Sequence, residues 1–157
     1  MDMKKWKPYL LSAVIALLVG GLSGLLSREG MEIYNTVAVK PALSPPMWVF
    51  PVAWSILYIL MGVGAARVWL QAPSKERSQG LNLYVLQLIV NFFWSLLFFN
   101  AQAYGFAVLW LLLLWLLVLG MILTFRKVAP LAAKLQIPYL LWLTFALYLN
   151  ISVWQLN

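Results

Sequence analysis

Charged residues divide the chain into long hydrophobic blocks. In chain order, the four longest uncharged stretches hold 20, 26, 48 and 23 residues. About 20 apolar residues suffice to cross a bilayer, so the longest stretch can supply two spans, with a polar turn between Asn100 and Gly105. The pattern therefore predicts five transmembrane helices, over roughly 8–27, 46–70, 80–100, 104–125 and 135–156.

The spans are expected to be helices and not strands. A transmembrane β-barrel needs short strands of alternating polarity, whereas the run LLLLWLLV from Leu111 to Val118 does not alternate. The chain has 157 residues, of which 64% are hydrophobic, and its mean hydropathy is +0.90. A soluble domain of this size cannot bury so much apolar surface. We expect an all-α integral membrane bundle of five transmembrane helices, forming one domain over residues 1–157.

The cations are distributed unevenly between alternate loops. If five spans are assumed, nine Lys and Arg residues fall in the N-terminal segment and in the second and fourth loops, whereas two, Arg28 and Lys40, fall in the first loop. Cytoplasmic loops of membrane proteins carry an excess of Lys and Arg. The bias predicts a cytoplasmic N-terminus and an outside C-terminus. It also accounts for the net charge of +7 without a nucleic-acid partner.

The residue types present exclude several kinds of chemistry. The chain has no His and no Cys, which excludes zinc sites, thiol chemistry and haem ligation by those residues. The acidic residues all fall outside the predicted spans, and they are Asp2, Glu29, Glu32 and Glu76. No intramembrane carboxylate is therefore available to relay protons. We expect no metal site, no resident cofactor and no acid–base catalytic residue, and therefore not an ordinary enzyme.

Three predicted spans carry aromatic stripes, because residues four apart share a helix face. The stripes contain Phe50, Trp54, Tyr58 and Gly62 in the second span, Gln87, Asn91 and Ser95 beside Trp94 and Phe98 in the third, and Pro138, Trp142, Ala146, Asn150 and Trp154 in the fifth. Unpaired amides are costly in hydrocarbon, so Gln87, Asn91 and Asn150 should face the bundle interior. Two interpretations stay open: the amides join helices by hydrogen bonds, or they line a cavity and offer donors to a ligand.

The nine tryptophans fall into three groups. Those near span ends are typical of the membrane interface, and they are Trp6, Trp48, Trp69 and Trp154. Trp110 and Trp115 stand among leucines in the fourth span and are expected to face lipid or a partner subunit, so that this span could serve a homodimer. Trp54, Trp94 and Trp142 share their stripes with small or polar residues, and a flat aromatic ligand could stack against them.

Two local patterns concern the first two spans. Ala16, Gly20 and Gly24 repeat every four residues, which favours close packing of the first helix within the fold. Pro45-Pro46 precede the second span, where proline suits the first turn of a helix, and Ser44 is the expected N-cap.

These motifs together resemble the translocator protein family, also called TspO, peripheral benzodiazepine receptor or tryptophan-rich sensory proteins. The resemblance covers nearly the whole chain. The matching segments are Lys40-Pro41, SPPMWVFP from Ser44 to Pro51 with Trp54, Tyr58 and Gly62, then Gln87, Asn91 and Trp94, and then Pro138-Tyr139, Trp142, Ala146 and Asn150. The resemblance implies a five-helix bundle, commonly a homodimer, with a pocket open toward the first loop.

The same resemblance implies a function and a set of site residues. The implied function is a membrane receptor or carrier for tetrapyrroles such as protoporphyrin IX and for similar hydrophobic aromatic ligands. Transport, sensing and light-dependent porphyrin degradation stay open within it. Carried over by position, the ligand-binding residues are Tyr34 from the first loop, Pro45, Phe50, Trp54, Tyr58, Asn91, Trp94, Trp142, Ala146 and Asn150. Of these, Trp54 and Trp142 are the photochemical candidates, and the cavity interpretation of Asn91 and Trp142 gains weight.

Other features limit or extend these implications. The sterol pattern at the end of the fifth span lacks its basic residue after Tyr148, so we do not expect sterol recognition. The family occurs in bacteria and in mitochondria. No Arg- and Ser-rich transit sequence precedes the first span, which favours a bacterial cell membrane. Two alternatives stay open: a small-molecule transporter without proton coupling, and a structural partner in a larger membrane complex.

Overall fold

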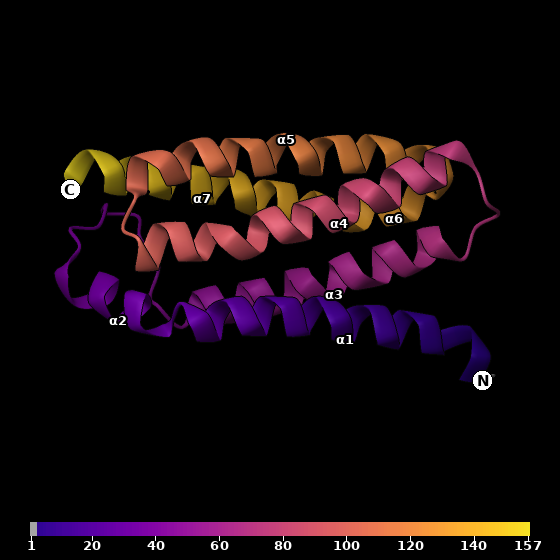
Figure 1. Ribbon diagram of the computed structural model, residues 1–157, viewed down its shortest axis with the longest axis horizontal. Helices are drawn as coiled ribbons and strands as arrows, with labels where there is room; N and C mark the ends of the chain where they lie inside the picture. Colours follow the sequence, from indigo (N-terminus) through magenta and orange to yellow (C-terminus); the bar gives the residue numbers. More distant parts are fainter. Residues whose placement is uncertain (1–2) are drawn as a thin grey trace.

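The computed structural model describes residues 3–157, and helices account for nearly all of that range (Figure 1). The long helices are α1 (Met3–Leu26), α3 (Val49–Trp69), α4 (Lys75–Ser95), α5 (Tyr104–Val128) and α7 (Ile137–Leu156), and the short elements are α2 (Arg28–Val37), the π-helical turn η1 (Leu96–Asn100) and α6 (Pro130–Leu135). Five helical segments in the described range are long and apolar enough to cross a membrane. The all-α fold class with five spans is therefore confirmed.

The five long helices lie side by side, and the two ends of the chain lie at opposite ends of the bundle, as an odd number of spans requires (Figure 1). Helix α1 packs chiefly against α3, whereas α5 packs against both α4 and α7. The connections from α3 to α4 and from α5 to α6 lie at the N-terminal end, together with most of the cations (Figure 1). Helix α2 crosses the opposite end, and we call this the α2 end.

Helix boundaries differ from the predicted ones where capping decides them. Helix α4 begins five residues earlier than predicted, because the Ser74 hydroxyl oxygen accepts a hydrogen bond from the backbone N–H of Arg77 at 3.0 Å. The expected N-cap at Ser44 is wrong, since α3 begins only at Val49 and no side chain caps it. It is Pro51 that lies in the first turn of α3, where a missing N–H costs no helical bond.

The first loop contains a helix that hydrophobicity did not predict. Helix α2 is too short to span a membrane, and its buried residues are Gly30 and Tyr34, four apart on one face. Its opposite side carries an exposed i,i+4 pair in which Arg28 Nε lies 3.9 Å from Glu32 Oε1. The amphipathic pattern was present in the sequence, but it falls in a stretch that lacks the length and hydrophobicity of a span.

Close contact between α1 and α3 depends on glycine. A Cβ at Gly62 would lie 2.5 Å from the Cα of Ala13, and a Cβ at Gly20 would overlap the ring of Tyr58. Ala16, between these contacts, is fully buried. The predicted packing of α1 within the fold is confirmed for Ala16 and Gly20, because small residues let the two backbones approach. At Gly24 it is wrong, since no atom lies within 4 Å of the Cβ position.

Candidate ligand-binding site

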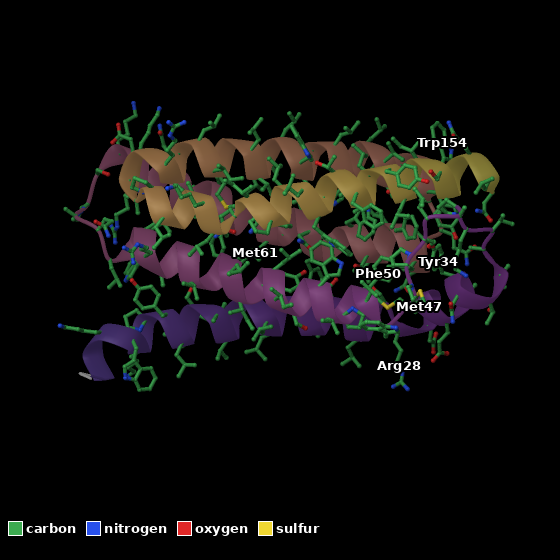
Figure 2. The ribbon with its side chains drawn as sticks, turned by 180° about the vertical axis from the view of Figure 1, so that it is seen from behind. Arg28, Tyr34, Met47, Phe50, Met61 and Trp154 are labelled. Carbon is green, nitrogen blue, oxygen red and sulfur yellow. The ribbon has the colours of Figure 1, made fainter. Side chains whose placement is uncertain are left out.

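A cavity of about 460 Å³ lies inside the bundle, in the half nearer the α2 end. Its walls come from α1, α2, α3, the last turns of α4 with η1, and α7, whereas α5 contributes no residue. Figure 2 shows Tyr34, Met47 and Phe50, which line the cavity, close together at this end of the bundle. The volume falls in the range of about 300–1,000 Å³ that small-molecule sites occupy.

The cavity brings together most of the residues predicted to bind a ligand. Those that line it are Tyr34, Phe50, Trp54, Tyr58, Asn91, Trp94, Trp142, Ala146 and Asn150. The exception is Pro45, which does not line the cavity. Because α3 begins four residues after Pro45, this proline stays in the irregular connection before the helix, and Met47 reaches the cavity instead.

One wall of the cavity is a cluster of aromatic rings centred on Trp54. Its ring centroid lies 5.7 Å from that of Tyr58, 6.1 Å from that of Tyr139 and 6.4 Å from that of Trp142. Phe50 meets Trp142 edge-on at 6.1 Å. Such offset and edge-to-face pairs contribute about 0.5–1.5 kcal/mol each beyond their buried area, so the wall is held in shape without a ligand.

A second aromatic cluster joins α2 to the end of α4. Trp94 stacks on Phe98 with centroids 5.1 Å apart, and Tyr34 contacts Phe98 and Phe99, each at 5.3 Å. The π-helical turn η1 carries both phenylalanines, and π turns inside α-helices frequently occur at functional sites. Phe99 was not part of any predicted stripe, because a stripe drawn with α-helical spacing does not anticipate a π turn.

Behind the aromatic wall, a chain of hydrogen bonds crosses from α3 through α4 to α7. The Tyr58 hydroxyl donates to Asn91 Oδ1 at 2.8 Å, and Asn91 Nδ2 donates to the Tyr139 hydroxyl at 2.6 Å. The Tyr139 hydroxyl donates in turn to Gln87 Oε1 at 2.8 Å. Gln87 and Tyr139 are both 0% exposed, so the chain satisfies polar groups that water cannot reach.

The amides combine the two roles that the sequence left open. Asn150 Oδ1 accepts from Trp94 Nε1 at 3.1 Å, and Asn150 Nδ2 donates to the carbonyl oxygen of Tyr104 at 2.9 Å. Asn91 and Asn150 therefore join helices and also line the cavity, whereas Gln87 joins helices only. All three face the interior, as predicted. An amide nitrogen has two N–H groups, so each of the two lining asparagines keeps one donor beyond its interhelical bond.

Trp142 carries a further donor. Its Nε1 is buried and has no hydrogen-bond partner in the described part of the chain, although the residue lines the cavity. A buried donor without a partner costs about 1–3 kcal/mol. Because this atom has less than 1 Å² of accessible surface, a ligand acceptor in the cavity meets it only if the indole ring turns.

The tryptophans of α5 make hydrogen bonds that the sequence did not predict. Trp110 Nε1 donates to the carbonyl oxygen of Val90 at 2.7 Å, and Trp115 Nε1 donates to Thr144 Oγ1 at 3.0 Å. Both rings are partly buried. Their facing lipid or a partner stays a prediction, but each indole N–H needs an acceptor in hydrocarbon and finds it within the bundle, on α4 and α7.

Lys40 lies at the rim of the cavity at the α2 end, beside Tyr34. Lys40 Nζ donates to the carbonyl oxygen of Asn35 at 2.8 Å and lies 5.2 Å from the ring centroid of Tyr34. Burial raises the pKa of Tyr34, so its hydroxyl stays neutral at physiological pH. Among the residues described, no charged side chain lines the cavity itself.

Sequence comparisons agree with this architecture. Residues 12–155 match the model of the TspO/MBR family. The chain is 44% identical over 144 residues to protein CrtK of Rhodobacter capsulatus, covering 91% of this chain and 89% of that protein. It is 37% identical over 144 residues to the tryptophan-rich protein TspO of Chlorobaculum tepidum, covering 91% of each. It is 36% identical over 157 residues to the human translocator protein, covering 97% of this chain and 91% of that protein.

Proposed function

Because the chain belongs to the TspO/MBR family, we propose that its cavity binds flat, hydrophobic aromatic ligands of the tetrapyrrole class, with protoporphyrin IX as the reference ligand. The protein then acts as a membrane receptor or carrier. One observation carries the proposal: Phe50, Trp54, Tyr58 and Trp142 form a continuous aromatic wall along an uncharged cavity inside the bundle. A planar macrocycle gains both burial and ring contacts against such a wall.

The polar groups of the cavity suit the rest of such a ligand. The unused N–H groups of Asn91 and Asn150 can meet its few acceptors. Its carboxylates would lie toward the α2 end, where Lys40 at the rim offers a charge-assisted hydrogen bond. We assign no catalytic residue of the acid–base kind.

Titration of the purified protein with protoporphyrin IX tests the proposal. Binding should shift the porphyrin absorption band and quench tryptophan fluorescence. A Trp54→Phe/Trp142→Phe double variant should bind at least about tenfold more weakly by the absorption measurement, since it loses two large contact surfaces. The matched control is Trp69→Phe/Trp154→Phe, two exposed tryptophans at the bundle ends, and it should bind like wild type. Equal affinity of all three proteins would contradict the proposed site.

A second candidate function is light-dependent porphyrin degradation, favoured by one contact. Trp54 and Trp142 meet edge-to-face and both line the cavity, so a bound porphyrin would touch two oxidisable rings. The ligand supplies the photochemistry, and the protein positions it. Illuminated samples should then give different product yields with the wild-type protein and with the double variant. Equal yields with and without protein would remove this candidate.

We also propose an orientation and an assembly. The concentration of cations at the N-terminal end supports a cytoplasmic N-terminus in a bacterial cell membrane. Because the chain contains no Cys, an Asn157→Cys variant can be labelled at one position, and reaction only from the cytoplasmic side would reverse the orientation. A homodimer is supported by the uncovered apolar face of α5, and native mass spectrometry from membranes measures it.

A further inference from the structure

We propose that ligands reach the cavity sideways from the lipid, through a gap between α1 and α3, and not through the water-facing end under α2. The inference rests on the proposed function of the cavity and names the route and the class of ligand: planar aromatic molecules already dissolved in the bilayer. The gap is framed by Gly21 and Gly24 of α1 and by Pro51 and Ser55 of α3. We call these residues the portal.

The portal is open at both of its sides. All four portal residues line the cavity, and Gly21, Pro51 and Ser55 are also exposed on the outer surface. A Cβ at Gly21 or Gly24 would meet no atom within 4 Å, whereas a Cβ at Gly20 would overlap the ring of Tyr58. The tight contact between α1 and α3 therefore ends at Gly20, and the next turn of α1 leaves the cavity open to the outside.

The surroundings of the portal are apolar. It lies within segments long and hydrophobic enough to span a membrane, and exposed Leu18, Leu22 and Val52 surround it. The Ser55 hydroxyl donates to the carbonyl oxygen of Pro51 at 2.7 Å, so it needs no partner in the gap. The Ser55 hydroxyl therefore presents no unsatisfied donor to hydrocarbon in the gap.

The α2 end, in contrast, is closed by tight packing. A Cβ at Gly30 would lie 2.5 Å from the backbone carbonyl carbon of Phe99, so α2 rests directly on the backbone of η1. Asn100 Nδ2 donates to the carbonyl oxygen of Leu26 at 2.8 Å, which joins the last residue of α1, just before α2, to the same turn. Tyr34 fills the remaining space against the rings of η1.

The connection after α2 is also held in place. Asn157 bonds the backbone of Val39 on both of its polar groups: its Oδ1 accepts from the Val39 N–H at 3.0 Å, and its Nδ2 donates to the Val39 carbonyl oxygen at 2.9 Å. In Figure 1 this connection runs from α2 across the bundle end toward the end of α7. A ligand passing under α2 must break these bonds together with the Tyr34 contacts, whereas the portal requires no bond to break.

The two routes can be blocked separately. A Gly21→Leu/Gly24→Leu variant, or Ser55→Leu from the opposite side, fills the portal. The control is Gly120→Leu on α5, where a Cβ would meet only Leu83 Cδ1 at 3.7 Å. The α2 end is locked by a Val39→Cys/Asn157→Cys variant joined by a short bis-thiol cross-linker, in a chain that has no other cysteine.

Liposomes that contain the protein are mixed in a stopped-flow instrument with liposomes preloaded with protoporphyrin IX, and the fluorescence change gives the association rate. Mixing the loaded protein with excess empty liposomes gives the dissociation rate. Filling the portal should lower both rates about tenfold or more, because a blocked route slows passage in both directions, whereas a merely smaller cavity would raise the dissociation rate. The locked variant and the Gly120→Leu control should match wild type.

Three results would overturn the inference. Unchanged rates in both portal-filled variants would show that ligand does not pass between α1 and α3. A tenfold or greater fall of the association and dissociation rates in the locked variant would show that the ligand passes under α2. A weaker equilibrium affinity at an unchanged association rate would show that the leucines only shrink the cavity. If wild-type protein itself binds no porphyrin, the proposed function fails, and this inference fails with it.

Discussion

The buried hydroxyl of Tyr139 should be worth a measurable part of the stability of the bundle. It accepts a hydrogen bond from Asn91 Nδ2 at 2.6 Å and donates one to Gln87 Oε1 at 2.8 Å, thereby joining α7 to α4. A Tyr139→Phe substitution keeps the ring and its contact with Trp54 but deletes both hydrogen bonds. The change is therefore confined to polar interactions.

The expected magnitude follows from what the substitution leaves behind. Hydrogen bonds between membrane helices average about 0.6 kcal/mol and reach about 1.7 kcal/mol. Without the hydroxyl, Gln87 Oε1 and one N–H of Asn91 lose their partners in surroundings that exclude water, and a buried unsatisfied group costs about 1–3 kcal/mol. Because both asparagine and glutamine can partly re-orient, we expect the free energy of unfolding to fall by about 1–3 kcal/mol in total.

Reversible unfolding in mixed micelles, followed by tryptophan fluorescence as the fraction of denaturing detergent rises, measures this loss. The matched control is Tyr148→Phe on the same helix, because Tyr148 is 41% exposed, and it should change the stability by less than about 0.5 kcal/mol. A double-mutant cycle with Tyr58→Phe should show coupling, since both hydroxyls bond Asn91. Equal effects of Tyr139→Phe and Tyr148→Phe would refute the reasoning.

Further predictions concern packing, charge and an indole donor. Gly62→Ala should destabilise the protein by about 1–3 kcal/mol, because its Cβ would collide with the backbone of α1. The control Gly120→Ala gains the same helix propensity without a collision and should not destabilise the protein. Detergent-induced unfolding compares the two variants. Lys40→Gln should lower the affinity for protoporphyrin IX several-fold but leave the affinity for its dimethyl ester unchanged, as absorption titrations would show. An equal loss of affinity for both compounds would contradict the proposed carboxylate contact. Trp110→Phe should cost about 1 kcal/mol in the same unfolding assay, since the carbonyl oxygen of Val90 loses a donor, and no loss would show that this bond contributes nothing.

The five spans could be predicted because hydrophobic length alone determines them. Helix α2 could not, since ten residues of mixed polarity in a loop give no such signal, and its position depends on contact between Gly30 and η1. The start of α4 depended on a capping hydroxyl, Ser74, that hydropathy does not weigh. Local hydrogen bonds and tertiary contacts therefore account for the differences in the fold.

The cavity walls could be predicted to a large extent, because residues four apart on three helices converge on one space. Pro45 was misplaced since its position depends on where α3 begins. The portal was not predicted, because the sequence pattern of Gly20 and Gly24 is the same whether a partner helix touches both or only one of them. Which glycine is packed and which is open depends on the angle between α1 and α3, and the residue pattern of one helix does not predict that angle.

The arrangement of donors explains how one cavity can be stable when empty and still select a ligand. Asn91 and Asn150 each have hydrogen-bond partners on neighbouring helices or at their ends, so their amide groups are not left without partners in the empty cavity. Trp142 Nε1 lacks such a partner and carries the associated cost in the unliganded protein. If the indole ring turns toward the cavity, a ligand acceptor removes that cost, and the spare N–H groups of Asn91 and Asn150 donate to further polar atoms, whereas a purely apolar ligand of the same shape uses none of these donors. The cavity should therefore favour flat aromatic molecules with a polar edge over hydrocarbons of equal area, which is the distinction a site surrounded by lipid needs to make.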